Sequence, residues 1–238
     1  MADSIYPNSA RRNCLAETYC EIAMESYYNA RSFYQQIKIN NYSCDNLYQL
    51  SEMEKQVIST VVFSAMCIEA FFNNYAAACL GDTEFYDNFD RLSAISKFQL
   101  IAKFILKTDI DKSKSYYSRL KQLIKKRDSY VHNKSSISEF QGFSKDEYEK
   151  LKNFEKITDE EYMELTFPKT EVDNTYKEAL NALKTIYDIA AFFDSYDTNI
   201  YAVIRLFHPS GIVFGEVLER QFKTVVFKDL GIKVDKFI

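Results

Sequence analysis

Glycine and proline are scarce in this sequence, which has 5 Gly and 3 Pro among 238 residues. Because both residues interrupt helices, their scarcity favours long helices over a turn-rich β architecture. Hydrophobic residues make up 47% of the chain and charged residues 27%, which is the composition of an ordinary globular protein. The length suits one large domain, or one domain with a sizeable appendage.

Tryptophan is absent, and histidine occurs only at His132 and His208. With so few histidines, no HExxH motif and no Asp-rich loop, we expect no zinc or calcium site. Neither a glycine-rich phosphate loop nor a GxSxG motif is present, which excludes the usual nucleotide loops and serine-hydrolase elbows. The sequence therefore predicts no cofactor. His208 precedes a proline and is expected in a surface loop.

The five cysteines form no CxxC pair, and the first residues lack the apolar run of a signal peptide. A continuous stretch of about 18 uncharged apolar residues is also missing, so no membrane-spanning helix is expected. These features together predict free thiols in a cytoplasmic protein that does not associate with membranes.

The net charge of -4 argues against a generally basic surface for nucleic acid, but the charge is unevenly distributed. Residues 112–134 contain eight basic side chains and one acid, whereas residues 139–173 contain eleven acids and five lysines. A basic segment in an acidic protein suits a local anionic ligand. A solvated helix face followed by an acidic loop explains the same pattern.

Apolar residues at helical spacing predict an all-α fold of about five helices. The helices are expected over residues 10–38, 47–80, 93–107, 113–130 and 171–196. Gly81 should end the second helix and Ser113 should cap the fourth. We expect three segments: an N-terminal helix within 1–46, a bundle over 47–196, and an appendage over 197–238. A polar loop is expected over 133–170, and the β-branched, aromatic appendage is compatible with a hairpin or helix–strand unit.

Arg127, Asp128 and His132 form the constellation best suited to chemistry. On an ideal helix Arg127 and His132 point about 140° apart, because they are five positions apart. They can serve one cavity if the helix end bends or frays, or if two copies of the motif face each other in a dimer. Asp128 is four positions before His132, where its carboxylate can orient the imidazole and favour the protonated form.

This trio is sufficient for RNA cleavage without a metal ion. An imidazole can accept the proton of a ribose 2′-OH or protonate the leaving 5′ oxygen. A guanidinium can bind the scissile phosphate and stabilise its additional charge in the transition state. An Arg127–Asp128 ion pair at the helix C-terminus, where the dipole favours His132, is the structural alternative.

Lysines and tyrosines surround the trio and extend the candidate site. Lys125, Lys126 and Lys134 can attract the nucleic-acid backbone without regard to sequence. Tyr130 and two tyrosines earlier in the helix can stack on unpaired bases. Packing in the core is the more common explanation for tyrosines at this helical spacing.

The segment from Arg127 to His132, with the sequence RDSYVH, resembles the Arg-x4-6-His motif of the HEPN superfamily, including a polar residue after the arginine. The stretch from Ser64 to Asn74 is similar to the early helix of HEPN bundles, which often carries an Ile-Glu-Ala-like sequence around the position of Glu69. The order of the helices also agrees. The resemblance covers about residues 50–196.

The resemblance implies a HEPN-like helical bundle and a metal-independent endoribonuclease, as in toxins and antiviral defence proteins. It also implies a homodimer with one composite cleft, an RNA substrate, and an antitoxin or regulatory protein as a further partner. HEPN toxins controlled by nucleotidyltransferase antitoxins carry a tyrosine two positions after the histidine. Lys134 occupies that position here, so this form of control is not expected.

Glu69 and Asn73 are four positions apart and form a narrow polar stripe on an otherwise apolar helix. A buried carboxylate needs a partner, and the resemblance suggests Arg127 or its surroundings. Glu69 would then be an orienting group and Asn73 would contact substrate. A purely structural buried pair is the alternative for Glu69.

Two other functions are compatible with the sequence. The first is a non-catalytic HEPN bundle that binds RNA, a nucleotide or a protein partner through the same basic groove. The second is a structural helical adaptor, in which the acidic loop of the chain covers the Arg127–His132 face.

Overall fold

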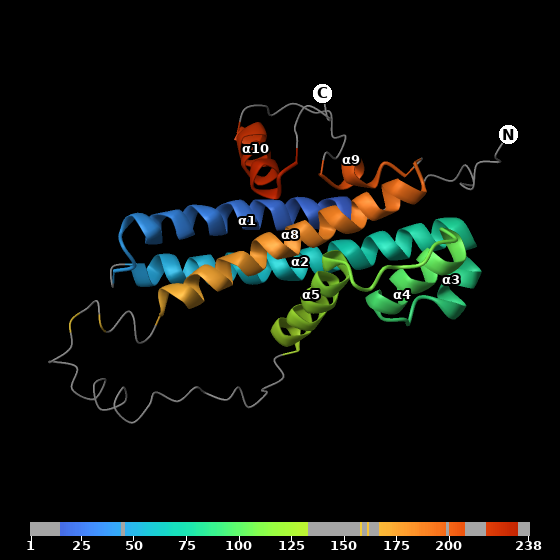
Figure 1. Ribbon diagram of the computed structural model, residues 1–238, viewed down its shortest axis with the longest axis horizontal. Coiled ribbons are helices and arrows are strands. Elements are labelled where there is room, and N and C mark those ends of the chain that lie inside the picture. Colours follow the sequence, from blue (N-terminus) through green and yellow to red (C-terminus); the bar gives the residue numbers. More distant parts are fainter. Residues whose placement is uncertain are drawn as a thin grey trace.

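The computed structural model describes residues 15–43, 46–132, 158, 161, 167–198, 200–207 and 218–232. Every regular element in these ranges is a helix, so the predicted all-α fold is confirmed. Long helices lie side by side, while shorter helices cover one end and one outer face (Figure 1). The predicted turn around His208 and most of the predicted acidic loop lie outside the described residues.

Helices α1 (Ala16–Ile39) and α2 (Leu47–Leu80) form an antiparallel pair. Ser26 and Ser59 hydrogen-bond across the pair at 2.9 Å, and the rings of Tyr19 and Phe63 lie 5.8 Å apart. The bounds of α2 are those predicted. Gly81 ends it with φ 84° and ψ 159°, a conformation that only glycine adopts without strain.

Helix α8 (Lys169–Tyr196) packs on both α1 and α2 and completes the core. The contact is largely aromatic: Phe193 lies 4.8 Å from Phe71 and 5.8 Å from Phe72, measured between ring centroids. Phe98 stacks on Phe72 at 5.4 Å and extends the cluster. Large rings bury more apolar area than other side chains, so this cluster contributes much of the stability of the bundle.

The predicted helix over 93–107 is present as α4 (Ala94–Leu100), continued by one π-helical turn, η2 (Ile101–Ile105). Ser93 caps α4 by accepting a hydrogen bond from the backbone N–H of Ser96 at 3.1 Å. A short helix that the sequence did not predict, α3 (Asp82–Asn88), lies between α2 and α4.

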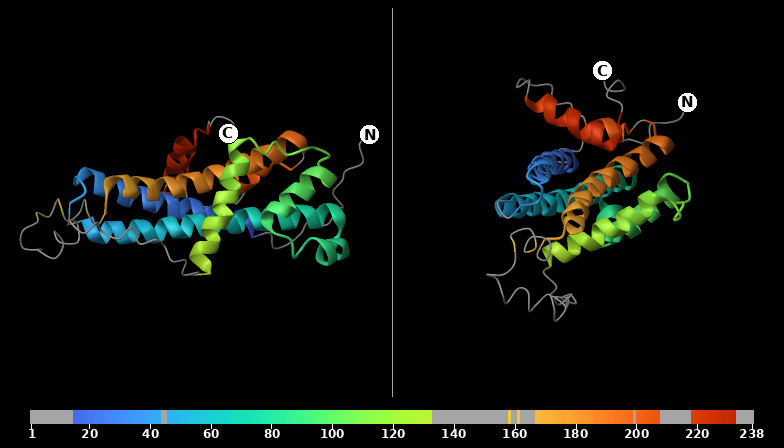
Figure 2. Two further views of the ribbon diagram at one scale, coloured as in Figure 1. Left: turned by 60° about the horizontal axis from the view of Figure 1, so that its bottom comes forward. Right: turned by 60° about the vertical axis from the view of Figure 1, so that its left-hand side comes forward.

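Helix α5 (Ser115–Val131) crosses α2 and α8 at a steep angle (Figure 2). It buries Tyr117, Leu120 and Leu123 against them. The prediction that Ser113 caps this helix is wrong. The Ser113 hydroxyl instead donates to the Asp111 carboxylate in the preceding turn, and the residue before α5 provides no side-chain cap.

The chain after α8 forms α9 (Ala202–Phe207) and α10 (Leu218–Leu230), so the described part of the appendage is helical and contains neither the hairpin nor the strand with which its sequence is compatible. The Asp194 carboxylate accepts hydrogen bonds from the backbone N–H groups of Ala202 and Val203, at 2.5 and 3.0 Å. It therefore satisfies donors at the start of α9 that the local sequence leaves without partners. Local sequence propensity cannot predict a cap that comes from another helix.

Hydrogen bonds from Tyr27 and Arg31 to the Asp229 carboxylate hold α10 against α1, and Tyr27 also contacts Tyr176 of α8. Tyr27 donates to Asp229 at 2.9 Å and lies 2.7 Å from the Tyr176 hydroxyl, while Arg31 donates to the same aspartate at 2.6 Å. Tyr27 is fully buried, and burial, followed by the contact with Tyr176, raises its pKa far above the usual range. The phenol therefore stays protonated and holds α10 as a hydrogen-bond donor.

Judged by length and composition alone, α2 is able to cross a membrane. Half of its most apolar 18-residue window is buried within the bundle, which is also compatible with a core helix. Cys20 and Cys79 are free thiols.

Candidate functional site

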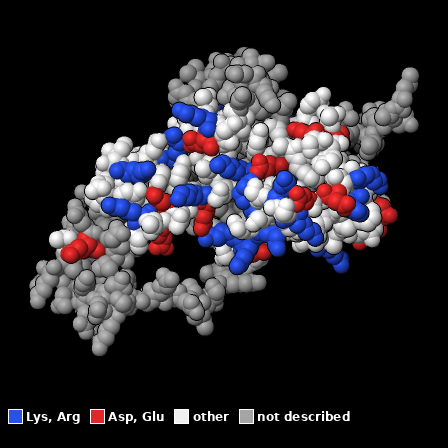
Figure 3. All heavy atoms as spheres, viewed as in Figure 1, with Lys and Arg blue, Asp and Glu red and all other residues white. Residues whose placement is uncertain are grey.

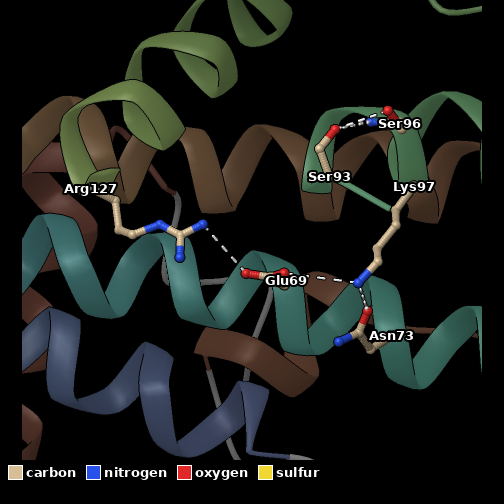
Figure 4. A network of polar contacts seen from close by, with 6 residues as sticks. All are labelled: Glu69, Asn73, Ser93, Ser96, Lys97 and Arg127. Atoms are coloured by element: carbon tan, nitrogen blue, oxygen red, sulfur yellow. Dashed lines mark hydrogen bonds and ion pairs between the residues drawn. The ribbon is translucent and has the colours of Figure 1, made fainter. Parts of the chain in front are cut away.

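Four polar side chains from three helices meet on one side of α2 (Figure 4). Glu69 forms ion pairs with two cations. Arg127 Nη2 of α5 lies 3.6 Å from Glu69 Oε2, and Lys97 Nζ of α4 lies 3.8 Å from Glu69 Oε1. Lys97 also donates to Asn73 Oδ1 at 2.7 Å. The polar stripe on α2 thus has partners on both neighbouring helices, and Arg127 is the partner that the resemblance suggested for Glu69.

Lys97 is a member of this cluster that the sequence reasoning missed. Its side chain is 2% exposed, so its ammonium has no access to bulk water. The available signal was positional, because Lys97 lies three residues after Ala94 and four before Ile101, within the apolar stripe of its helix. A lysine at such a position requires an acceptor inside the fold.

Arg127 is held by two carboxylates without a hydrogen bond to either. The 3.6 Å separation from Glu69 exceeds hydrogen-bonding distance, and Asp128 Oδ1 lies 3.1 Å from Arg127 Nε outside hydrogen-bonding geometry. The buried Nε–H has no acceptor among the residues that the structure describes. A partly buried guanidinium with spare donors is suited to binding a phosphate.

His132 ends α5, where its backbone N–H donates to the Asp128 carbonyl at 3.1 Å. The residue is exposed, and within the described ranges its imidazole has no hydrogen-bond partner. The expected pairing of the Asp128 carboxylate with His132 is not seen, because that carboxylate lies against Arg127. The Arg127 side chain extends along α2 towards Glu69, so one copy of the chain does not bring Arg127 against His132.

The remaining predicted cations lie along α5, which carries five basic residues and one acid. Lysine and arginine side chains gather over this helix in Figure 3. Lys121 and Lys125 are exposed and have no carboxylate partner in the described part of the chain, whereas Lys126 pairs with Glu178 at 2.9 Å. Lys134 lies outside the described residues.

Tyr130 is half-buried and donates to Glu178 at 3.0 Å. Burial, followed by the charge of Glu178, raises the pKa of this phenol, which therefore remains a donor at neutral pH. Tyr117, one of the earlier tyrosines, is buried and accepts a hydrogen bond from Gln99 at 2.7 Å, so it packs in the core. These contacts favour packing over base stacking for Tyr117 and leave the predicted role of Tyr130 untested.

No family model, curated protein or solved structure matches this chain. The class of protein that the fold defines is an all-α bundle crossed by a basic helix. No group of three or more His, Cys, Asp or Glu side chains that could hold a metal ion occurs among the described residues. The resemblance to HEPN proteins therefore rests on sequence features only, which are the Arg-x4-His motif, the stretch around Glu69 and the order of the helices.

Proposed function

We propose that this protein is a metal-independent endoribonuclease of the HEPN type. The observation that carries the proposal is the Arg127 guanidinium, which Glu69 and Asp128 position while Nε–H keeps no acceptor among the described residues. The guanidinium is partly exposed and makes no hydrogen bond to either carboxylate, so its remaining donors can bind a phosphate oxygen at the C-terminal end of a helix rich in lysine.

In the proposed reaction His132 transfers protons and Arg127 binds the scissile phosphate. The imidazole accepts the ribose 2′-OH proton, and the 2′ oxygen attacks the adjacent phosphorus. A protonated imidazole then gives a proton to the leaving 5′ oxygen. This leaves a cyclic phosphate on one product and a hydroxyl on the other. Such a reaction suits a cytoplasmic toxin or defence protein that acts on RNA.

In a homodimer, Arg127 of one chain and His132 of the other can meet at one phosphate, which the two residues of a single chain do not. Arg127 points along α2, whereas His132 lies exposed at the end of α5, and the two are about 140° apart on an ideal helix. Two copies that face each other through the ends of α5 can place the histidine of one near the arginine of the other. The paired helices also bring their unpaired lysines to one cleft, which attracts RNA.

The test is cleavage of single-stranded RNA by the purified protein in the presence of chelator. We expect cleavage by the wild type and a loss of at least about 100-fold in Arg127→Ala and His132→Ala, because general acid–base groups and groups that stabilise transition-state charge each contribute factors of that order. Arg91→Ala, at an exposed arginine between α3 and α4, and His208→Ala are the matched controls and should cleave normally. Equal cleavage by all variants contradicts the proposal.

The second candidate is a non-catalytic bundle that binds RNA through the same basic helix. It is favoured by one observation: His132 has no partner among the described residues to orient its imidazole for proton transfer. In that case wild-type protein binds RNA and leaves it intact, and Lys125→Ala weakens binding to all RNA sequences alike.

A further inference from the structure

A pocket of about 140 Å³ lies between α2, α5 and α8. Val61, Leu123 and Ala182, all buried, contribute its apolar lining. The exposed amides of Gln122 and Asn181 lie at its rim, one on each of the two crossing helices. An apolar floor with amides at the mouth is the usual construction of a site for a small, flat, polar group.

The charged side chains of the pocket are already paired. Lys126 lies 2.9 Å from Glu178, and Arg119 forms an ion pair with Asp188 on α8. The lining therefore has little net charge and offers no free cation to a phosphate. An uncharged ligand with hydrogen-bonding edges suits it better, because such a ligand leaves both ion pairs intact.

The pocket retains hydrogen-bonding capacity for such a ligand. Each amide provides donors and an acceptor, which is the pattern that reads the edge of a base. Thr185 uses its hydroxyl hydrogen on the Asn181 carbonyl at 2.7 Å, so its oxygen remains an acceptor.

The pocket adjoins the proposed cleavage site on the same helix. Lys126 lines it, and Arg127 is the next residue along α5. Leu123 of the pocket lining precedes Arg127 by four residues and lies on the same face of α5, an advance of about 6 Å along the helix. One base of a strand whose phosphate meets Arg127 can therefore reach the pocket.

We propose that this pocket between α2, α5 and α8 binds one unpaired base of the RNA and sets the sequence preference of the protein. The inference rests on the proposed function for the identity of the ligand as RNA. Direct readout of a splayed-out base by side-chain amides over an apolar floor is a general mode of single-strand recognition.

The experiment measures equilibrium binding by the full-length protein of short 2′-O-methyl homopolymers of each of the four bases, and of an abasic strand of equal length. These probes cannot be cleaved through the 2′ oxygen, so binding is measured apart from catalysis. The variants are Gln122→Ala and Asn181→Ala, both at exposed positions where truncation leaves the core intact. Asn174→Ala, an exposed amide of α8 outside the pocket, is the matched control.

We expect the wild type to prefer one base by about tenfold, and each pocket variant to remove most of that preference. Binding of the abasic strand should be equal in all variants, and Asn174→Ala should behave as wild type. Equal affinity for the four bases, an equal loss of abasic binding, or no RNA binding at all overturns the inference. A wild type that discriminates bases yet cleaves no RNA refutes the nuclease and leaves the pocket standing. A wild type that cleaves RNA but binds the four bases equally refutes the role of the pocket and leaves the nuclease proposal standing.

Discussion

At the scale of single residues, one carboxylate links the candidate site to the core. Glu69 neutralises both a buried lysine and the arginine to which we assign the phosphate. The Glu69 carboxylate therefore both positions Arg127 and provides the counter-charge for the buried Lys97 ammonium. Replacing this carboxylate should therefore lower the stability of the protein, whether or not the protein cleaves RNA.

We predict that Glu69→Gln lowers the free energy of unfolding by about 1–3 kcal/mol, because it leaves the Lys97 ammonium without a counter-charge. The side chain of Glu69 is 33% exposed, which keeps the loss below that of a fully buried pair. In a Lys97→Met background the same change should cost less, since the ammonium is gone. Urea unfolding of the four proteins measures the coupling.

The control for this cycle is Glu84→Gln on α3, where the carboxylate is exposed and accepts from Asn88 at 3.0 Å. It should change stability by less than about 0.5 kcal/mol. Strictly additive effects of the Glu69 and Lys97 changes would show that the two groups do not interact in solution.

At the scale of secondary-structure elements, the end of α2 depends on the backbone of one residue. Gly81 has φ 84° and ψ 159°, and a Cβ placed there would meet no atom within 4 Å. We predict that Gly81→Ala destabilises the protein by about 1–3 kcal/mol through backbone strain alone. Denaturant midpoints measure it, with Thr83→Ala on the exposed face of α3 as control. An unchanged midpoint would mean that this turn relaxes freely.

The docking of α10 should depend on pH through Tyr27. Its pKa is raised in the folded state, so the folded protein holds the phenol proton more tightly than the unfolded chain does. The resulting stability is complete below the ordinary tyrosine pKa of about 10 and is lost as the pH rises above it.

We predict that wild type exceeds Tyr27→Phe in stability by about 1 kcal/mol at pH 8, the usual value of a hydrogen bond. The difference should shrink as the pH passes about 10, because phenylalanine cannot titrate. Urea unfolding at a series of pH values measures it. Tyr48→Phe, at an exposed tyrosine, is the control and should show no such trend. A pH-independent difference for Tyr27 would contradict the argument.

At the scale of the whole molecule, the proposed cleft requires two chains. Arg127→Ala and His132→Ala proteins each retain the group that the other lacks. If one cleft takes its arginine and histidine from different subunits, mixing the two inactive variants should restore part of the RNA cleavage. Mixing either variant with itself is the control. A mixture as inactive as its components would contradict a cleft that two subunits share in this way.

Much of the architecture follows from the sequence because it depends on local periodicity. The 47–80 helix, its end at Gly81 and the helices corresponding to α5 and α8 were predicted from apolar spacing and helix-ending residues. The same logic failed for α9, whose first turn is capped by Asp194 from another helix. It also failed at Ser113, whose hydroxyl has a closer acceptor in Asp111.

The sequence by itself determined an all-α chain with one basic segment and a single Arg-x4-His motif, because these are properties of composition and spacing. Only the tertiary structure decided which groups meet. It joined Glu69 to Arg127 and Lys97, turned the Asp128 carboxylate towards Arg127, and enclosed a neutral pocket beside the motif. The physical reason is that contacts between distant side chains depend on how helices cross, and crossing angles follow from packing rather than from local propensity.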